Sequence, residues 1–337
     1  MHALVCREPG TLLLEDRPEP SPLPGDVLVQ IRRVGICGTD FHIFEGSHPF
    51  LDYPRVMGHE LSAEVLEAPA GSGLKQGQSV IVNPYLSCGT CHACRIGKPN
   101  CCMRIAVLGV HRDGGMCERL SLPAANLYPA NDLTLDQAAT IEFLAIGAHG
   151  VRRAGIVHGT PTLVIGAGPI GLGAAIFASI SGGIVTLMDR DPHRLAAAAA
   201  IVKAALAIVA DENAREVIDI ETGGTGFDVV IDATGNRTSM ESGFRYVAHG
   251  GTYLLLSVVR DDITFSDADF HKREMTLMGS RNALKVDFDH VTASIAANKV
   301  PVADLITNRT TLAGAVTDLP RWATNKQGLI KALISVD

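Results

Sequence analysis

The stretch Gly166-Ala-Gly-Pro-Ile-Gly171 decides the fold of this chain. It follows an apolar run at residues 162–165 that predicts a buried strand, and it opens a run of small residues at 170–180 that predicts a helix. Gly166 permits a tight turn, Gly168 lets a pyrophosphate approach the backbone, and Gly171 lets the helix pack closely on the strand. Because the start of the helix offers unpaired N–H groups to phosphate, the stretch predicts a dinucleotide site.

The next predicted strand, at 184–188, supports this interpretation because Asp189 follows it directly. A carboxylate there can bind both ribose hydroxyls of NAD and repel the extra phosphate of NADP. Arg190 could tolerate that phosphate, so NAD is favoured and NADP stays open. A glycine turn without a ligand is the less favoured alternative, because strand, helix and carboxylate occur together. The expected cofactor contacts are Gly166, Gly168, Pro169, Ile170, Gly171, Asp189, Arg190, Arg194, Thr234, Ser257 and Val258.

Outward from this turn, strands and helices alternate. Strands are predicted at 228–232, 252–259 and 275–279, and a second helix at 192–207. This alternation predicts an α/β fold with a doubly wound parallel sheet. Residues before about 140 favour short strands separated by Pro and Gly, and the C-terminal part predicts helices near 288–298 and 319–324 and a strand at 329–336. We therefore expect one domain over 1–143 and 283–337 and a second over 144–282.

Composition narrows the function classes. The chain has 337 residues, 47% of them hydrophobic and 19% charged, with a net charge of −7. This is typical of a compact protein, and the acidic balance disfavours nucleic acid as a partner. Residues 154–188 carry no charge, but glycines and prolines interrupt them, so we expect no membrane span. The N-terminus lacks an apolar signal region, which predicts the cytoplasm.

Four cysteines share a spacing that suits one metal ion: Cys88-x2-Cys91-x2-Cys94-x7-Cys102. Four thiolates saturate a tetrahedral zinc, so this lobe predicts a structural site. Cys101 makes the register ambiguous, and Cys102 is chosen on spacing. A nucleic-acid-binding zinc ribbon is the alternative, and the acidic balance disfavours it.

A second metal site is indicated by residues that are distant in the sequence. Cys37, His59, Glu60 and Glu142 are all plausible zinc ligands, and three protein ligands with one open position are typical of catalytic zinc. Each residue alone also fits an ordinary role, as a buried thiol, a core histidine or a solvated carboxylate. Their occurrence together with the cysteine lobe favours the metal site.

These motifs, with Gly35-Ile-Cys-Gly-Thr-Asp40, Gly58-His-Glu60 and Asp232-Ala-Thr-Gly235, resemble the zinc-containing medium-chain dehydrogenase/reductase family over essentially the whole chain. The resemblance implies a GroES-like catalytic domain, a Rossmann domain, two zinc ions per chain and NAD. It implies that Cys37 and His59 bind catalytic zinc, with Glu60 bound directly or through water, and Glu142 points to the polyol (sorbitol-like) branch. Ala63, Pro69 and Phe143 depart from the usual motifs, which puts local loop shape in doubt but not the ligands.

Three further stretches resemble sugar-acid dehydrogenases of the L-galactonate 5-dehydrogenase type. They lie at 109–115, 265–274 and 278–283. Arg281 with Asn282 would suit a substrate carboxylate, although a salt bridge for Arg281 is weighed equally, and His111 is a weaker candidate contact. The implied reaction oxidises a secondary hydroxyl of a polyol or sugar acid.

The resemblance also assigns catalytic roles. Thr39 would accept the substrate proton, which would pass through the cofactor ribose to His42, and Asp40 would orient His59. A simple alcohol or L-threonine-type dehydrogenase is the nearest alternative, and a non-catalytic zinc-bearing binding protein is disfavoured because no ligand is missing. Relatives of this kind are commonly homo-tetramers or homo-dimers, so we expect one of these assemblies.

Overall fold

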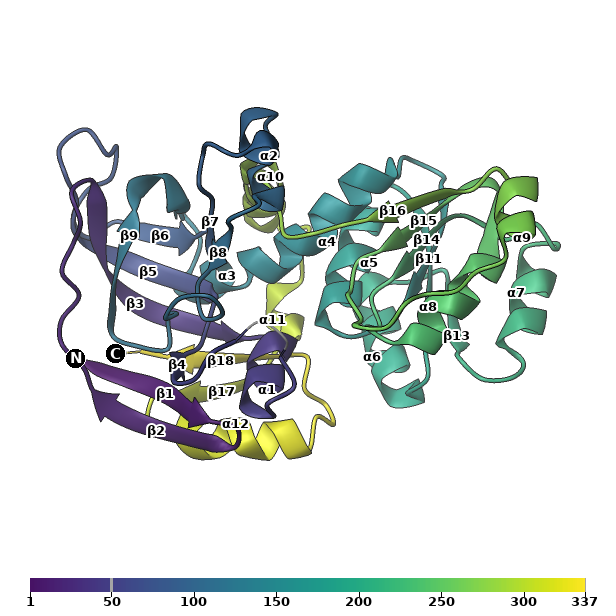
Figure 1. Cartoon of the computed structure of the whole chain (residues 1–337). Coiled ribbons are helices and arrows are strands. Elements are labelled where there is room, and N and C mark those ends of the chain that lie inside the picture. The colour runs from purple at the N-terminus through teal and green to yellow at the C-terminus, as the bar shows by residue number, and fades with distance from the viewer. Residues whose placement is uncertain (49–50, 337) are drawn as a thin grey trace. The chain divides into compact units, whose positions relative to one another are not determined.

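The computed structural model describes residues 1–48 and 51–336 (Figure 1). The chain forms two compact units, Met1–Glu142 with Val291–Asp337, and Phe143–His290. The expected boundaries were 143/144 and 282/283. The second boundary differs because helix α10 (Lys285–Ala296) continues through it, so no turn residue marks the place where the chain returns.

A mixed sheet of seven strands is the main element of the first unit. Its long central strand is β3 (Asp26–Ile36), which pairs with β5 (Glu60–Glu67) and β18 (Lys331–Ser335). The remaining members are β6 (Ser79–Val82), β9 (Arg119–Pro123), β10 (Leu127–Pro129) and β17 (Ile306–Thr311). Since β18 comes from the end of the sequence, this unit is built from both ends of the chain.

Smaller elements surround this sheet. Strands β1 (His2–Glu8), β2 (Thr11–Asp16) and β4 (Arg55–Val56) form a three-stranded sheet, and β7 (Tyr85–Leu86) pairs with β8 (Ala106–Val107). The helices are α1 (Gly38–Phe44), α2 (His92–Arg95), α3 (Leu135–Ala139), α11 (Val302–Leu305) and α12 (Ala315–Thr324). Alternate side chains of β3, including Val27, Val29 and Ile31, are fully buried in the core. This alternation explains why a short β-branched motif suffices to predict the strand.

The second unit confirms the doubly wound parallel sheet. Its strand order is β13-β12-β11-β14-β15-β16, and every pair is parallel. The strands are β11 (Pro161–Ile165), β12 (Ile184–Asp189), β13 (Leu206–Val209), β14 (Phe227–Asp232), β15 (Val247–Leu255) and β16 (Thr276–Gly279). The order reverses between β11 and β14, and ligands of such sheets bind beyond the carboxyl ends of the strands at this reversal.

The connecting helices are α4 (Ile141–Ala154), α5 (Pro169–Ile180), α6 (Pro192–Val202), α7 (Ala214–Glu221), α8 (Arg237–Gly243) and α9 (Asp267–Lys272). The helix predicted at 192–207 is wrong beyond Val202. Lys203 ends it in the left-handed conformation, with φ 56°, and the next residues pair with β12 as strand β13. The alanine-rich sequence favours helix beyond Val202, but pairing at the edge of the sheet overrides this helix propensity.

The predicted strand at 252–259 is also shifted. Strand β15 begins at Val247 and ends at Leu255, so residues 256–259 form a loop beyond its carboxyl end. Val258 is 86% exposed, which fits a loop rather than a buried strand. Throughout residues 1–48 and 51–336, no helix combines the length and apolar character needed to cross a membrane.

Candidate active site

The first predicted ligand, Cys37, lies at the junction of strand β3 and helix α1. The backbone N–H of Cys37 donates to Asp40 Oδ2 at 2.8 Å, and the N–H of Gly58 donates to Asp40 Oδ1 at 3.2 Å. Asp40 is fully buried. Its carboxylate therefore ties the segment that carries Cys37 to the segment that carries His59. These hydrogen bonds go to backbone groups, so the orientation of the His59 ring by Asp40 stays a prediction.

Cys37, His59 and Glu60 converge in the first unit. One ligand atom from each lies within 4.8 Å of the others, as expected for a shared metal ion. His59 directly precedes strand β5, and Glu60 is its first residue, so the pairing of β5 with β3 brings them to Cys37. Glu142, in the first turn of α4, interacts electrostatically with His59 and Glu60.

Two buried polar atoms at this site lack a hydrogen-bond partner within the described part of the chain: His59 Nδ1 and Glu142 Oε2. A buried polar atom without a partner costs about 1–3 kcal/mol, and a metal ion would satisfy both atoms. Thiolate, imidazole and carboxylate also form a donor set that zinc prefers. The residues present therefore fit a catalytic zinc ion.

The pKa shifts at the site reflect its burial and its charges. Burial raises the pKa of Glu142 to about 7, although the neighbouring His59 opposes this shift. Burial would lower the pKa of His59, but its contact with Cys37 and the nearby carboxylates of Asp40 and Glu142 raise it well above its usual value. Burial therefore disfavours the charged form of Glu142, and a cation bound at the site would favour it.

Two residues that the sequence analysis missed contact the candidate carboxylate ligands. Lys331, fully buried in β18, places Nζ 2.7 Å from both carboxylate oxygens of Glu60. The hydroxyl of Tyr85, in β7, donates to Glu142 Oε1. A signal existed for Lys331, because a single lysine inside the apolar run 329–336 implies a buried partner. Nothing in the sequence marked Tyr85.

The cysteine lobe brings together the four predicted thiols. The Sγ atoms of Cys88 and Cys102 lie 3.4 Å apart, and those of Cys91 lie 3.5 Å from Cys94 and 3.9 Å from Cys102. Four sulfurs at ~2.3 Å from a tetrahedral zinc lie roughly 3.8 Å from one another. Cys101 is outside this group. The lobe therefore has the geometry of a saturated zinc site.

The thiols of the lobe differ in acidity. Hydrogen bonds from the backbone N–H groups of Thr90 and Cys91 lower the pKa of Cys88 to about 5, and Arg104 Nη2 lies 3.4 Å from its Sγ. Burial instead raises the pKa of Cys94 to about 11. Metal binding would therefore displace protons from the more weakly acidic thiols.

The glycine turn after β11 has the predicted geometry. Gly166 adopts φ 97°, which other residues rarely tolerate, and a Cβ on Gly171 would collide with the carbonyl oxygen of Gly166. Gly168 precedes α5 at the N-cap position. The turn is thus built for close approach of backbone and ligand at a helix start, with Pro169 and Ile170 in the first turn of the helix.

Asp189 ends strand β12 beside this turn. Its Oδ2 accepts from the N–H of Ala167 at 2.7 Å, and its Oδ1 accepts from the N–H of Asp191 at 2.8 Å. The Nη1 atom of Arg194 lies 3.9 Å from Asp189 Oδ2, and Arg190 is exposed. The carboxylate of Asp189 and the guanidinium groups of Arg190 and Arg194 therefore lie at one end of the strand. The carboxylate would favour NAD, and the guanidinium groups could accommodate the extra phosphate of NADP.

The other predicted cofactor residues lie at neighbouring strand ends. Thr234 follows β14, and its N–H and hydroxyl donate to Asp232 Oδ1 at 2.9 and 2.7 Å. Ser257 and Val258 lie in the loop after β15. All of these residues belong to the same edge of the parallel sheet, where a dinucleotide is expected.

The predicted relay residues both lie on α1. Thr39 Oγ1 is 3.8 Å from the Sγ of Cys37. His42, one turn later, is 59% exposed, and its Nδ1 lies 3.3 Å from Ser47 Oγ. Helix α1 thus carries Thr39 beside the candidate ligand Cys37 and, one turn later, His42 at the surface.

The predicted substrate residues are not brought together within one unit. Arg281 and Asn282 lie after β16 in the second unit, where Asn282 has φ 54°. His111 is exposed in the first unit, and its Nδ1 accepts from the N–H of Val107 at 3.2 Å. Their contacts with substrate stay predictions.

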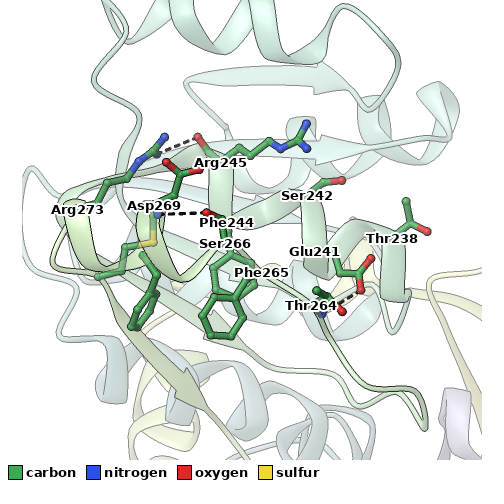
Figure 2. Close-up of a pocket in the computed structure, with 12 residues that line it drawn as sticks. Thr238, Glu241, Ser242, Phe244, Arg245, Thr264, Phe265, Ser266, Asp269 and Arg273 are labelled. Atoms are coloured by element: carbon green, nitrogen blue, oxygen red, sulfur yellow. Dashed lines mark hydrogen bonds between the residues drawn. The ribbon is translucent and has the colours of Figure 1, made fainter.

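A cavity of about 490 Å³ lies elsewhere, on the second unit beside α8 and α9 (Figure 2). The rings of Phe244 and Phe265 stack with centroids 4.7 Å apart, and Arg245 and Arg273 contribute polar walls. Among the described residues that line it, none belongs to the predicted metal, cofactor or substrate set. The cavity is therefore separate from the candidate active site.

Fold and site together define a metal-dependent dehydrogenase with a dinucleotide-binding sheet. Residues 23–132 match the alcohol dehydrogenase GroES-like domain and residues 169–297 match the zinc-binding dehydrogenase domain. The chain belongs to the zinc-binding dehydrogenases of the alcohol dehydrogenase family.

Individual relatives cover nearly the whole chain. It is 41% identical over 336 residues to L-galactonate-5-dehydrogenase of Escherichia coli K12, covering 99% of each protein. The crystal structure of an Escherichia coli CFT073 alcohol dehydrogenase (rspB) with NADH is similar with a TM-score of 0.92, at 28% identity and 99% coverage of both chains. A zinc-binding dehydrogenase from Sinorhizobium meliloti bound to NADP has a TM-score of 0.89, at 28% identity and 99% and 98% coverage.

Proposed function

We propose that this enzyme oxidises a secondary hydroxyl of a sugar acid similar to L-galactonate, with NAD as the hydride acceptor. The observation that carries the proposal is the convergence of Cys37, His59 and Glu60, together with the buried atoms His59 Nδ1 and Glu142 Oε2, which have no hydrogen-bond partner among the described residues. The similarity of the chain to L-galactonate-5-dehydrogenase over 99% of its length supports a sugar-acid substrate.

The residues of the first unit have distinct roles in this proposal. Cys37 and His59 hold the catalytic zinc with Glu142 or Glu60. A zinc ion held by these residues would act as a Lewis acid that lowers the pKa of the substrate hydroxyl. Thr39 would take the proton of that hydroxyl while its own hydroxyl proton passes by way of the cofactor ribose to His42, which is exposed to solvent near the other end of α1 and would release it. Asp40 keeps the two ligand segments together through its backbone hydrogen bonds.

The second unit binds the cofactor. The helix start at Gly168 accommodates the pyrophosphate, and Asp189 accepts hydrogen bonds from the adenosine ribose. Arg281 and Asn282 are proposed to bind the substrate carboxylate, because a guanidinium and an amide can both donate to it. We also propose a homo-tetramer or homo-dimer in the cytoplasm, which sedimentation analysis and cell fractionation would test.

The direct experiment measures NAD reduction with a panel of hexonates, neutral polyols, L-threonine and simple alcohols. We expect the highest kcat/KM with a hexonate. Arg281→Gln should then raise the KM for hexonates more than for neutral polyols, because the guanidinium is proposed to donate to the substrate carboxylate, which neutral polyols lack. A higher kcat/KM with ethanol or L-threonine than with every hexonate would contradict the proposal and support the alcohol or L-threonine alternative.

The metal assignment has its own test. Cys37→Ser or His59→Ala should lower kcat by at least about 1,000-fold while the melting temperature stays close to that of the wild type, because these residues hold the catalytic metal and not the core. Full activity in protein shown to contain no metal would exclude the zinc mechanism.

A further inference from the structure

Glu142 differs from Glu60 in how its carboxylate is held. Only one oxygen of Glu142, Oε1, accepts a hydrogen bond, from the hydroxyl of Tyr85. The other, Oε2, is buried and has no partner among residues 1–48 and 51–336. Both oxygens of Glu60 instead lie 2.7 Å from the Nζ atom of Lys331. Glu142 therefore keeps one oxygen available as a metal ligand, whereas both oxygens of Glu60 contact the buried ammonium group of Lys331.

Tyr85 itself is rigidly placed. Its N–H donates to Asn83 Oδ1 at 3.0 Å, and its carbonyl oxygen accepts from Asn126 Nδ2 at 3.3 Å. Its side chain is only 6% exposed. A phenol fixed in this way can set the position of a carboxylate with little loss of conformational entropy, since the ring has few rotatable bonds.

We propose that Tyr85 is a positioning residue for the catalytic metal: its hydroxyl holds Oε1 of Glu142 so that Oε2 alone is offered as a ligand. The inference rests on the proposed zinc-dependent function. It implies a ligand set of Cys37, His59 and Glu142. The carboxylate that lies within 4.8 Å of Cys37 and His59 in this structure is that of Glu60, which would stay the partner of Lys331. Residues that orient metal ligands typically contribute about 10–100-fold to metal affinity.

The test compares Tyr85→Phe with the wild type by metal binding rather than by turnover. The catalytic zinc is exchanged for Co²⁺, its affinity is measured by chelator competition, and its visible absorption spectrum is recorded. We expect Tyr85→Phe to bind Co²⁺ about 10–100-fold more weakly and to change the spectrum, because the carboxylate can then rotate or bind through both oxygens. Equal affinity and an unchanged spectrum would overturn the proposal.

Tyr128→Phe is the matched control. Its hydroxyl accepts from Asn83 Nδ2 at 2.8 Å in the same unit, and Asn83 is not one of the candidate ligands. It should leave Co²⁺ affinity and spectrum unchanged, so a loss equal to that of Tyr85→Phe would indicate a general structural effect and overturn the assignment.

A double-mutant cycle tests whether Tyr85 affects metal affinity through Glu142 alone. In a Glu142→Ala background, Tyr85→Phe should cause no further loss of Co²⁺ affinity, because the carboxylate that it positions is gone. A further tenfold loss would contradict the proposed route. If the wild type binds two metal ions and reduces NAD while Tyr85→Phe binds Co²⁺ equally well, only the positioning role fails. A wild type without a second metal ion would overturn the proposed function itself.

Discussion

At the scale of single residues, Lys331 and Glu60 form an ion pair in the interior of the first unit. Both side chains are fully buried, so each charge has lost its hydration and depends on the other. Burial would lower the pKa of Lys331, but the carboxylate of Glu60 outweighs this and raises it. Removing either partner therefore leaves the other one buried without the group that it contacts at 2.7 Å.

Lys331→Met should accordingly lower the free energy of unfolding by about 3–5 kcal/mol, since it leaves Glu60 uncompensated. Urea denaturation at pH 7 measures this loss. The double variant Lys331→Met/Glu60→Gln should recover a large part of it, because no buried charge remains. A single variant as stable as the wild type would show that Glu60 finds another cation.

Asp189 gives a second prediction at this scale. Asp189→Ala should lower the preference for NAD over NADP, measured as the ratio of kcat/KM values, by about tenfold, or ~1.4 kcal/mol. The carboxylate also accepts the N–H groups of Ala167 and Asp191, so affinity for both cofactors should fall as well. An unchanged ratio would exclude Asp189 as the discriminating residue.

The sequence indicated the candidate ligands but not the residues that contact them. Cys37, His59 and the four cysteines of the lobe could be predicted because few residue types bind zinc and their spacing is restrictive. Tyr85 could not, because a tyrosine is common in any β-rich segment and its partner is 57 residues away. Only the fold brings such pairs together.

At the scale of elements, helices α4 and α10 are joined by a cluster of charged groups around the buried carboxylate of Asp287. Asp287 accepts from His149 Nδ1 at 2.8 Å and from Arg152 Nε at 2.7 Å. Burial alone would raise the pKa of Asp287, but these hydrogen bonds lower it from 3.8 to about 2. A carboxyl group with a depressed pKa stabilises the fold above its unfolded pKa, and this stabilisation is lost as pH falls toward the folded value.

The difference in unfolding free energy between the wild type and Asp287→Asn should therefore shrink by about 1 kcal/mol between pH 6 and pH 3. Urea denaturation across this range measures it, and using the difference cancels groups that titrate in both proteins. Asp289→Asn is the control, since Asp289 lies on the same helix, is 56% exposed and pairs only with Lys285 among the described residues. A difference for Asp287→Asn that does not vary with pH would contradict the assignment.

The cysteine lobe is the second element that can be tested alone. Cys94→Ser should remove one zinc ion per chain and lower the melting temperature by several degrees, because metal binding contributes directly to the stability of such a lobe. Cys101→Ser is the control, since the thiol of Cys101, which directly precedes Cys102, lies outside the group of four. Equal zinc content in the two variants would exclude the structural site.

Element boundaries were predictable where a local signal exists. The glycine turn and α5 lie within one residue of the prediction. The predicted helix at 192–207 instead includes Leu206 and Ala207 of β13, because no proline or glycine separates the alanine-rich helix from this strand. Its strand conformation comes from pairing with β12, a non-local contact that no short window of sequence contains.

At the scale of the whole molecule, the two proposed zinc sites differ in how closed they are. Four thiols converge in the lobe, enough to saturate a tetrahedral ion, whereas three proposed protein ligands at the catalytic cluster would leave one position for substrate. A chelator should therefore reach the catalytic metal first. The two losses should also have different consequences, because the catalytic ligands lie beside a packed sheet that does not depend on the metal, while the lobe has little core of its own.

Dialysis against a chelator should thus abolish NAD reduction when about one zinc ion per chain has been removed, with the melting temperature and circular dichroism still unchanged. Added Zn²⁺ should restore activity at that stage. Removal of the second ion should lower the melting temperature. Cys37→Ser is the control: it should begin with one zinc ion and show only the later loss of stability. Activity and melting temperature falling together, in proportion to total zinc from the first ion removed, would mean that the two sites are not independent.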